Sequence, residues 1–404
     1  MDRRKFIKYA LATAATSVIP VTIKPAIAKS NAGKKISISN PYAKVDWNEF
    51  GQYKANLHCH TIMSDGHACV DDMAKTYKEA GFSILAISDH DCVIKEKRPK
   101  EFIETACLDK NYISFITWPW CDFGAKSPRM HGLTGIEANE LTTKHHMNSY
   151  FNGYGLGSNI ENNYGYNEDQ QLDEVQRRNG LSIVNHPGIQ ASWNQEKSLQ
   201  WYIDLFKVHP ASSLVGMEIT NRVNKEWDGF DISLWDQLLA EFMPVRPIWG
   251  FGNDDAHSHN ESRFSFNVFY FDICTQANVR QAMLDGQFTF CDSSRYIDYT
   301  KEKIKDGTFP YINSIKVDEK AQTITLDAKD YDQIRWITAP KSAKQIGDYV
   351  TSKQPWEMGQ VVGDAKTISY NRPAVKNYLR AELIHKDGKE SYRTFVNPFG
   401  IKSL

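Results

Sequence analysis

The feature that most constrains the fold is a repeated alternation between short β-rich runs and helical stretches, from Lys54 to about Arg295. The β-rich runs are Ala55–Leu57, Ile84–Ile87, Ile113–Trp118, Leu181–Val184, Leu214–Ile219, Ile248–Phe251 and Val268–Phe271. The helical patterns between them are Val70–Ala80, Asp169–Arg178, Ser198–Lys207, Ile232–Phe242 and Gln276–Asp285. This alternation predicts an α/β fold of parallel strands with helices outside them, and about seven repeats favour a barrel over an open sheet.

The pattern changes after about residue 300. Short strand-like segments follow one another: Ile312–Val317, Thr323–Asp327, Gln333–Ile337, Thr367–Tyr370, Tyr378–His385 and Tyr392–Val396. Their spacing predicts a small C-terminal β-sandwich. A chain of 404 residues is long enough for two folded units, so we predict one domain over residues 51–300 and a second over 301–404. Of the twelve histidines only His385 lies in the second, so we expect the chemistry in the first.

The N-terminal residues 1–28 have the character of an export signal. The run Arg3-Arg4-Lys5-Phe6-Ile7-Lys8 resembles a twin-arginine signal, and Ala26-Ile27-Ala28 offers a cleavage site for signal peptidase. The apolar run Tyr9 to Ile19 is too short to span a bilayer stably. We therefore expect a periplasmic or otherwise extracytoplasmic protein with no transmembrane segment in its mature chain; a disordered basic tail is the alternative. Residues 29–50 are predicted to be a linker.

Histidine and aspartate follow several predicted strands at the point where each strand ends. His58 and His60 stand two positions apart, so they project from the same face of a strand while Cys59 faces away. Further groups follow later strands: Ser64-Asp65-Gly66, Ser88-Asp89-His90-Asp91, Asn185-His186-Pro187 and Asp255-Ala256-His257. In a parallel barrel the C-terminal strand ends form the face where active sites assemble. We therefore predict a metal site there.

Taken together and in this order, these motifs resemble those of the PHP (polymerase and histidinol phosphatase) superfamily of metal-dependent phosphoesterases, over about residues 54–295. The resemblance implies a distorted seven-stranded (β/α) barrel with two or three metal ions. It implies as ligands His58, His60, Asp65, His90, His186, Asp255 and His257, among which Asp65, His90, Asp255 and His257 are also expected to take part in catalysis.

The family also has a carboxylate that bridges two metals, usually a glutamate in a Pro-x-x-Glu context, followed by a further ligand histidine. The matching segment here reads Pro119-Trp120-Cys121-Asp122, and His131 follows. The resemblance therefore implies Asp122 and His131 as ligands. Aspartate has a side chain one methylene shorter than glutamate, and the nearby Glu137 and Glu140 are alternative bridging residues.

Other residues near the motifs have less defined roles. Asp254 competes with Asp255 as a ligand, and the Asp-x-His spacing favours Asp255. Asp89 and Asp91 could orient ligands or cap a helix. Arg263 and Arg295 could contact a substrate phosphate or form ordinary salt bridges. The remaining candidates are Glu218 and Asn221, expected to line the site, and His145 and His146, expected on the surface of an irregular insertion, Lys144 to Gln170, that we predict to cover the site.

Imidazole and carboxylate ligands favour zinc, manganese or iron. We expect two or three such ions to serve hydrolysis of a small phosphorylated substrate, a phosphomonoester or a phosphodiester. The net charge of -1 disfavours a nucleic-acid substrate, and no sequence feature predicts an oligomeric state. Seven cysteines without a Cys-x-x-Cys pair argue against a zinc ribbon or a disulfide framework. The alternatives are an amidohydrolase-type metal hydrolase, which also begins with His-x-His, and a non-catalytic metal- or glycan-binding exported protein.

Overall fold

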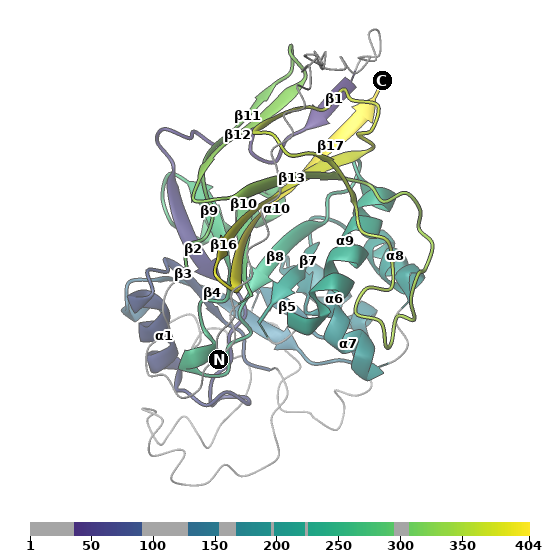
Figure 1. Cartoon of the computed structure of the whole chain (residues 1–404). Coiled ribbons are helices and arrows are strands. Elements are labelled where there is room, and N and C mark those ends of the chain that lie inside the picture. The colour runs from purple at the N-terminus through teal and green to yellow at the C-terminus, as the bar shows by residue number, and fades with distance from the viewer. Residues whose placement is uncertain (1–35, 91–127, 153–166, 195–197, 223–224, 295–306) are drawn as a thin grey trace, which may run out of the picture.

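The structure is a computed structural model that describes residues 36–90, 128–152, 167–194, 198–222, 225–294 and 307–404 (Figure 1). Its helices are α1 (Val70–Glu79), α6 (Glu168–Arg177), α7 (Pro187–Asn194), α8 (Leu199–Val208), α9 (Asp228–Phe242) and α10 (Gln276–Asp285), with short 3-10 turns η1 (Lys225–Trp227) and η2 (His259–Glu261). The strands of the α/β half are β2 (Gly51–Asn56), β3 (Ile84–Ile87), β4 (Thr134–Leu141), β5 (Met147–Tyr150), β6 (Leu181–Val184), β7 (Leu214–Asn221), β8 (Trp249–Asn253), β9 (Ser265–Phe271) and β10 (Phe288–Ser293). The other strands are β1 (Ile36–Ser39), β11 (Tyr311–Asp318), β12 (Thr323–Lys329), β13 (Gln333–Thr338), β14 (Gln360–Gly363), β15 (Thr367–Ser369), β16 (Tyr378–Asp387) and β17 (Glu390–Ser403).

The strands of the first half form a mixed sheet that is largely parallel. β2, β3 and β4 pair in parallel, and so do β6, β7 and β8. The short strand β5 joins the two sets by pairing antiparallel to both β4 and β6. The predicted α/β class is therefore confirmed. The predicted strand Ile113–Trp118 lies outside the described residues.

The predicted closed (β/α)7 barrel is wrong in its closure. The paired strands form an open path that ends at β8, and the described part of the chain contains no ladder between β8 and β2. The reason is that both edges of β2 are taken, one by β3 and the other by the antiparallel strand β9. The segments after β2 and β8 meet at one isolated parallel bridge, between Cys59 and Ala256.

The C-terminal strands continue the same sheet. β17 pairs with β10 on one side and with β16 on the other, and β13 and β14 extend the sheet beyond β16 (Figure 1). β1, which lies in the predicted linker, also pairs with β17. The boundary predicted at residue 300 thus falls between strands of one continuous sheet.

A second, three-stranded sheet of β11, β12 and β15 packs against these C-terminal strands. One hydrophobic cluster contains Ile315 and Leu326 from the small sheet together with Trp336 and Leu383 from the large one. Two antiparallel layers that share a core are the arrangement expected of a sandwich. One of these layers, however, belongs to the α/β sheet.

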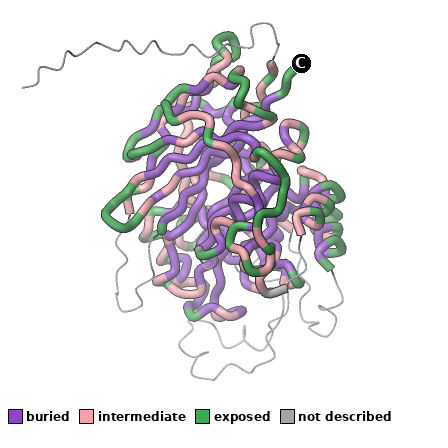
Figure 2. The backbone as a smooth tube through the Cα atoms, turned by 45° about the vertical axis from the view of Figure 1, so that its right-hand side comes forward, coloured by how far each residue is buried: buried purple, intermediate pink, exposed green. Residues whose placement is uncertain are grey.

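Helix α9 lies at the centre of another large hydrophobic cluster. Its side chains Phe230, Trp235 and Leu238 are fully buried, and the cluster also includes Trp356 and Tyr378 from the C-terminal part. In Figure 2 the buried backbone follows the strands and the inner helices, and exposed segments lie mainly at the periphery. Among the described residues no helix is long and apolar enough to cross a membrane.

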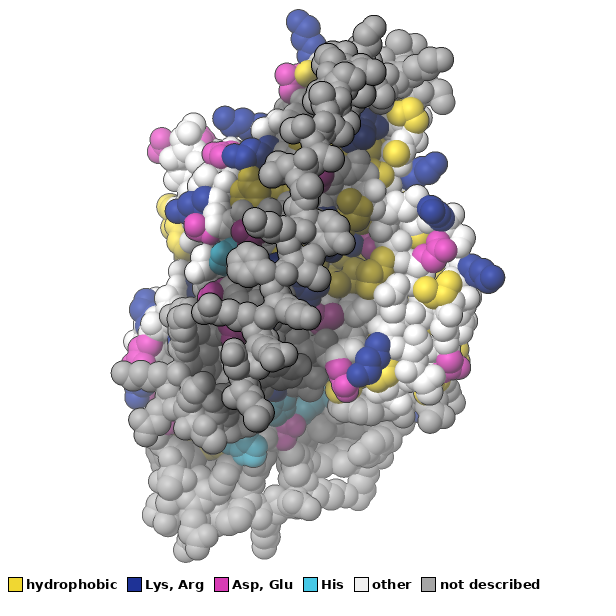
Figure 3. Space-filling model, viewed as in Figure 1, with side chains coloured by type: hydrophobic (Ala, Val, Ile, Leu, Met, Phe, Trp, Pro, Cys, Tyr) yellow, Lys and Arg dark blue, Asp and Glu magenta, His cyan; other side chains and the backbone are white. Residues whose placement is uncertain are grey.

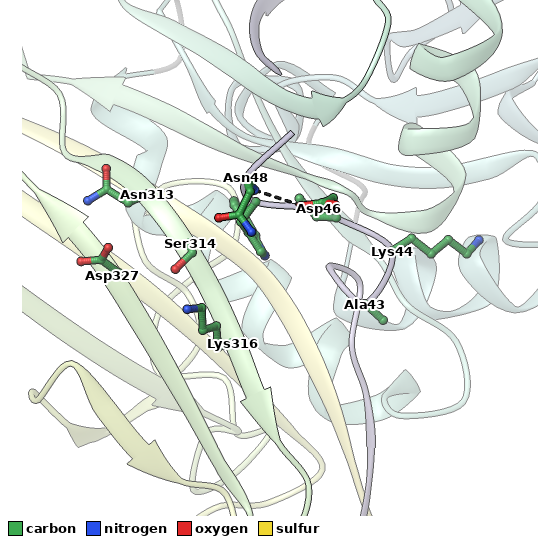
Figure 4. A pocket seen from close by; sticks show the side chains of 10 residues that line it. Ala43, Lys44, Asp46, Asn48, Asn313, Ser314, Lys316 and Asp327 are labelled. Carbon is green, nitrogen blue, oxygen red and sulfur yellow. Dashed lines mark hydrogen bonds between the residues drawn. The ribbon is translucent and has the colours of Figure 1, made fainter. Parts of the chain in front are cut away.

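A surface cleft in the described part of the molecule contains none of the predicted metal ligands. It is lined by the β1–β2 connection, including Trp47 and Asn48, and by Ser314, Lys316 and Asp327 of β11 and β12 (Figure 4). The side chains drawn there are mostly polar, and none is a histidine. This cleft therefore lacks the residue types expected of the metal site.

Candidate metal centre

Histidine, aspartate and glutamate side chains gather where the strands of the α/β half end. His58 and His60 follow β2, His90 follows β3, His186 follows β6, and Asp255 and His257 follow β8, while Glu140 lies near the end of β4. Because parallel strands end at the same edge of a sheet, side chains distant in sequence meet there. Four groups that could hold a metal ion result: His58, His60 and Asp255; His58, Glu140 and His186; His60, Asp65 and His257; and His60, His90 and Glu140.

Glu140 joins two of these groups through its two carboxylate oxygens. Its Oε1 lies 3.4 Å from His58 Nε2 and 3.2 Å from His186 Nε2. Its Oε2 lies 3.2 Å from His60 Nε2 and 3.1 Å from His90 Nδ1. A carboxylate placed in this way can bridge two ions that lie side by side.

Two aspartates complete the groups. Asp255 Oδ1 lies 3.2 Å from His58 Nε2 and 3.0 Å from His60 Nε2. Asp65 Oδ2 lies 3.4 Å from His90 Nε2 and 3.3 Å from His257 Nε2. Asp65 is the most exposed member, with a side chain 40% accessible to solvent. The cluster is therefore buried at His58 and exposed to solvent at Asp65. Histidine and acidic side chains are visible in the lower half of Figure 3, beside residues that are not described.

The donor spacing fits the coordination shell of a divalent ion. Nitrogen and oxygen ligands about 2.0–2.1 Å from zinc lie about 3.4 Å apart at tetrahedral angles and about 2.9 Å apart at right angles. The distances between 3.0 and 3.4 Å around Glu140 and Asp255 fall in this range. Asp255 Oδ1 is also buried, and the imidazoles of His58 and His60 lie within 3.2 Å of it. A buried carboxylate needs a compensating positive charge, which protonated imidazoles or a bound cation can supply.

The electrostatics of the cluster favour cations. Burial by itself lowers the pKa of His58, but the carboxylates of Asp255, Glu140 and Glu218 raise it more, and this pKa lies well above that of an ordinary histidine. Burial raises the pKa of Glu140, but His146, His58 and His90 lower it more, and it lies well below the usual range. The carboxylates are therefore ionised and favour positive charge on the imidazoles. Divalent ions bound at the cluster would supply that positive charge in place of the protons.

Backbone strain occurs at two of the cluster residues. His186 has a φ of 23° and Asp255 a φ of 51°. Residues other than glycine seldom adopt positive φ, and such strain is held in place by the surrounding structure, often at functional sites. His186 is held by its own N–H, which donates to Glu218, and Asp255 by its N–H, which donates to the carbonyl of His58.

The structure brings together seven residues proposed from the sequence as ligands: His58, His60, Asp65, His90, His186, Asp255 and His257. Asp122 and Arg295 lie outside the described residues. Glu140, one of the two alternatives considered for the bridging carboxylate, lies among the histidines of the cluster, whereas Glu137 is 30% exposed and faces Arg129.

His131 lies elsewhere. It precedes β4, at the opposite end of that strand from Glu140, and its Nε2 bonds Asp71 in the first turn of α1. His146 lies against the cluster instead, with its Nδ1 3.0 Å from Glu140 Oε1. It immediately precedes β5, and because β5 runs antiparallel to β4, the start of β5 and the end of β4 share an edge. The surface role expected for His146 is therefore wrong; the strand order, which the sequence did not reveal, is the missing signal.

Several neighbours have structural contacts. Asp254 accepts the backbone N–H groups of Phe264 and Ser265, which fix the turn before β9. Asp89 accepts from the backbone and hydroxyl of Thr61 and so holds the turn after His60. His145, expected on the surface, is buried and stacks on Trp201. Arg263 donates its backbone N–H to Asp254, and its contact with a substrate phosphate stays a prediction.

No protein-family model and no curated protein matches the sequence. Solved structures resemble it at low identity. They include a two-domain protein from Bacteroides vulgatus that contains a predicted PHP-like metal-dependent phosphoesterase, with 12% identity, 89% of each chain covered and a TM-score of 0.44. A lesion-specific endonuclease from Pyrococcus furiosus has 14% identity over 58% of this chain and 56% of its own, with a TM-score of 0.35. An amidohydrolase from Chromobacterium violaceum has 12% identity over 58% of this chain and 96% of its own, with a TM-score of 0.34. These similarities are distant, so the function is inferred from the cluster itself.

Proposed function

We propose that this protein is a metal-dependent hydrolase of a phosphate ester, with two or three divalent ions held at the cluster around Glu140. The observation that supports this most is the placement of the two oxygens of Glu140 against two different pairs of imidazoles. A lone structural ion would not need a bridging carboxylate, whereas hydrolytic centres that clamp a phosphate between neighbouring ions do.

The residues divide the work by position. His58, His186 and Glu140 would hold one ion on the buried side, and His60, His90 and Glu140 a second. Asp65 and His257, the more exposed members, would hold a third ion or face the substrate. When bound, such ions supply positive charge for the phosphate oxygens and lower the pKa of water that will attack phosphorus. Imidazole and carboxylate donors suit zinc, manganese or iron.

The proposal includes the substrate class and the location. A small phosphomonoester or phosphodiester fits a multinuclear centre, and the near-neutral chain offers no general attraction for nucleic acid. We propose that the protein acts outside the cytoplasm after twin-arginine export. The predicted signal, residues 1–28, lies outside the described part of the structure.

The test is metal analysis of the purified chain followed by assays with p-nitrophenyl phosphate and bis(p-nitrophenyl) phosphate, alongside amide and lactone substrates. We expect at least two equivalents of metal and phosphate release that chelators abolish and added metal restores. His60→Ala should remove both the metal and the activity, because His60 belongs to three of the four groups.

Other results would favour the alternatives. Turnover of amides or lactones but of no phosphate ester would identify an amidohydrolase-type enzyme. Metal binding without turnover of any substrate, in a protein whose biological role survives His60→Ala, would identify a binding protein.

A further inference from the structure

Behind the cluster, Glu218 on β7 lies in a fully buried position surrounded by hydrogen-bond donors. Its Oε1 lies 2.9 Å from His58 Nδ1 and 2.8 Å from Asn253 Nδ2. Its Oε2 lies 3.0 Å from the backbone N of His186 and 2.9 Å from Asn221 Nδ2. Glu218 itself belongs to none of the four groups that could hold a metal.

The neighbours fix the direction of these bonds. Asn253 turns its oxygen away from Glu218 to accept from the backbone N–H of Leu57, so its amide group donates to the carboxylate. The N–H of His186 can only donate. A carboxylate accepts only, so His58 carries a proton on Nδ1 in this contact. Its Nε2 is then free of that proton and faces Glu140 and Asp255.

We propose that Glu218 is a positioning residue of the metal centre, which holds His58 in the Nδ1–H tautomer and thereby aims its Nε2 lone pair at the ion. This inference rests on the proposed function, because it assigns Glu218 a role in preparing that same centre. A carboxylate behind a ligand histidine fixes both the tautomer and the orientation of the ring. Glu218 also accepts a hydrogen bond from the backbone N–H of His186, so it supports both histidines that flank Glu140 on the buried side.

The substitution Glu218→Gln tests this role because glutamine keeps the shape of the side chain but replaces one acceptor oxygen by an NH2 donor group. The glutamine amide has one NH2 group, and in either orientation that group faces two donors. If it faces His186 N and Asn221, a backbone N–H is left without an acceptor. If it faces His58 and Asn253, His58 can relieve the conflict by moving its proton to Nε2, where it blocks the metal.

The first experiment uses the wild-type protein loaded with zinc, with 15N-labelled histidine. The two ring nitrogens of His58, assigned by comparison with a His58→Asn variant, are expected to show a protonated Nδ1 and a metal-bound Nε2. A His58 that binds zinc through Nδ1, or that carries its proton on Nε2, would overturn the inference.

The second experiment compares zinc affinity and stoichiometry in Glu218→Gln and in Asn221→Ala. Asn221 donates to the other oxygen of the Glu218 carboxylate, so its substitution by alanine leaves the contact between Glu218 and His58 intact. We expect Glu218→Gln to weaken zinc binding by on the order of 10- to 100-fold, with the His58 proton shifted to Nε2, and Asn221→Ala to bind zinc as the wild type does.

The outcomes separate this inference from the proposed function. Wild-type protein that binds metal and hydrolyses phosphate esters, together with a folded Glu218→Gln of unchanged affinity and tautomer, would overturn the role of Glu218 alone. Equal losses in Glu218→Gln and Asn221→Ala would assign Glu218 a structural role. Wild-type protein that binds no metal would remove the proposed function and this inference together.

Discussion

Glu140 and Glu137 offer a direct comparison at the scale of single residues, because they lie three positions apart on β4 with opposite surroundings. Glu140 is 1% exposed among five imidazoles, and Glu137 is 30% exposed beside Arg129. We expect Glu140→Gln to lose at least one equivalent of metal, since an amide bridges cations poorly, and Glu137→Gln to keep the full number. Elemental analysis of the two purified variants measures this. Equal metal contents would show that Glu140 is not the bridge.

His146 and His131 form a second comparison. We expect His146→Ala to lower metal affinity, because its ring contacts Glu140, and His131→Ala to leave metal affinity unchanged.

The contact of His131 helps to lower the pKa of Asp71 to about 2, from about 3.9 in an unfolded chain. That lowering stabilises the fold above about pH 4, and the contribution is lost as the pH falls toward 2. Because Asp71 is 39% exposed, the loss in His131→Ala should stay below about 1 kcal/mol. Metal titration measures the affinities of the two variants, and urea unfolding at neutral pH measures the stability of His131→Ala. Loss of metal in His131→Ala would contradict the placement of His131 outside the metal centre.

At the scale of elements, α9 is fastened to β16 by a buried ion pair. Asp236 accepts from Arg380 Nε and Nη2, each at 2.8 Å, and also from Tyr378 and Gly359. Arg380 in turn donates to Glu382 at 2.7 Å. Arg380→Met would leave these buried carboxylates without their cation, so we expect the free energy of unfolding to fall by about 3–5 kcal/mol.

The matched control is Lys353→Met, which removes an exposed pair with Glu226 and should cost less than about 1 kcal/mol. Urea denaturation of both variants gives the comparison. A loss in Arg380→Met as small as that in Lys353→Met would mean that the buried pair does not fasten the helix.

The sequence predicted the elements that have strong local patterns. The run Leu181–Val184 and the helix Gln276–Asp285 have the bounds that were expected. β4 was missed because Gly135, Glu137 and Asn139 interrupt its apolar residues, and β5 because its four residues lie in an irregular insertion. The seven candidate ligands that belong to motifs were named from the sequence, and they lie together in the structure. Glu140 was named only as an alternative and lies on the missed strand β4, and His146 immediately precedes the missed strand β5. Their place at the cluster depends on pairings between strands, which no local pattern encodes.

At the scale of the whole molecule, the sheet passes through the boundary that the sequence suggested between two domains. β17 covers the edge of β10, and removing it would expose backbone donors and acceptors together with the apolar side chains that face the small sheet. We expect a chain that ends at Ser294 to be insoluble, and a chain that lacks only residues 1–35 to remain soluble with its metal. Expression and size-exclusion chromatography of the two truncations provide the test. A soluble, metal-binding fragment ending at Ser294 would show that the α/β half is an independent domain.

The bridge between Cys59 and Ala256 has a consequence for the order in which the molecule assembles. Nearby Asn56 and Asp254, which hydrogen-bond to each other, are 198 positions apart in the chain. Contacts of such high sequence separation form late, because the intervening chain must first be ordered. In refolding experiments with cobalt as a spectroscopic probe, we expect the visible absorption of the bound ion to appear after the tryptophan signal of the core. Cobalt absorption that develops first would indicate instead that the ion gathers its ligands from an unfolded chain. If the metal centre forms late, only a chain in which the segments after β2 and β8 have already met can bind its ions.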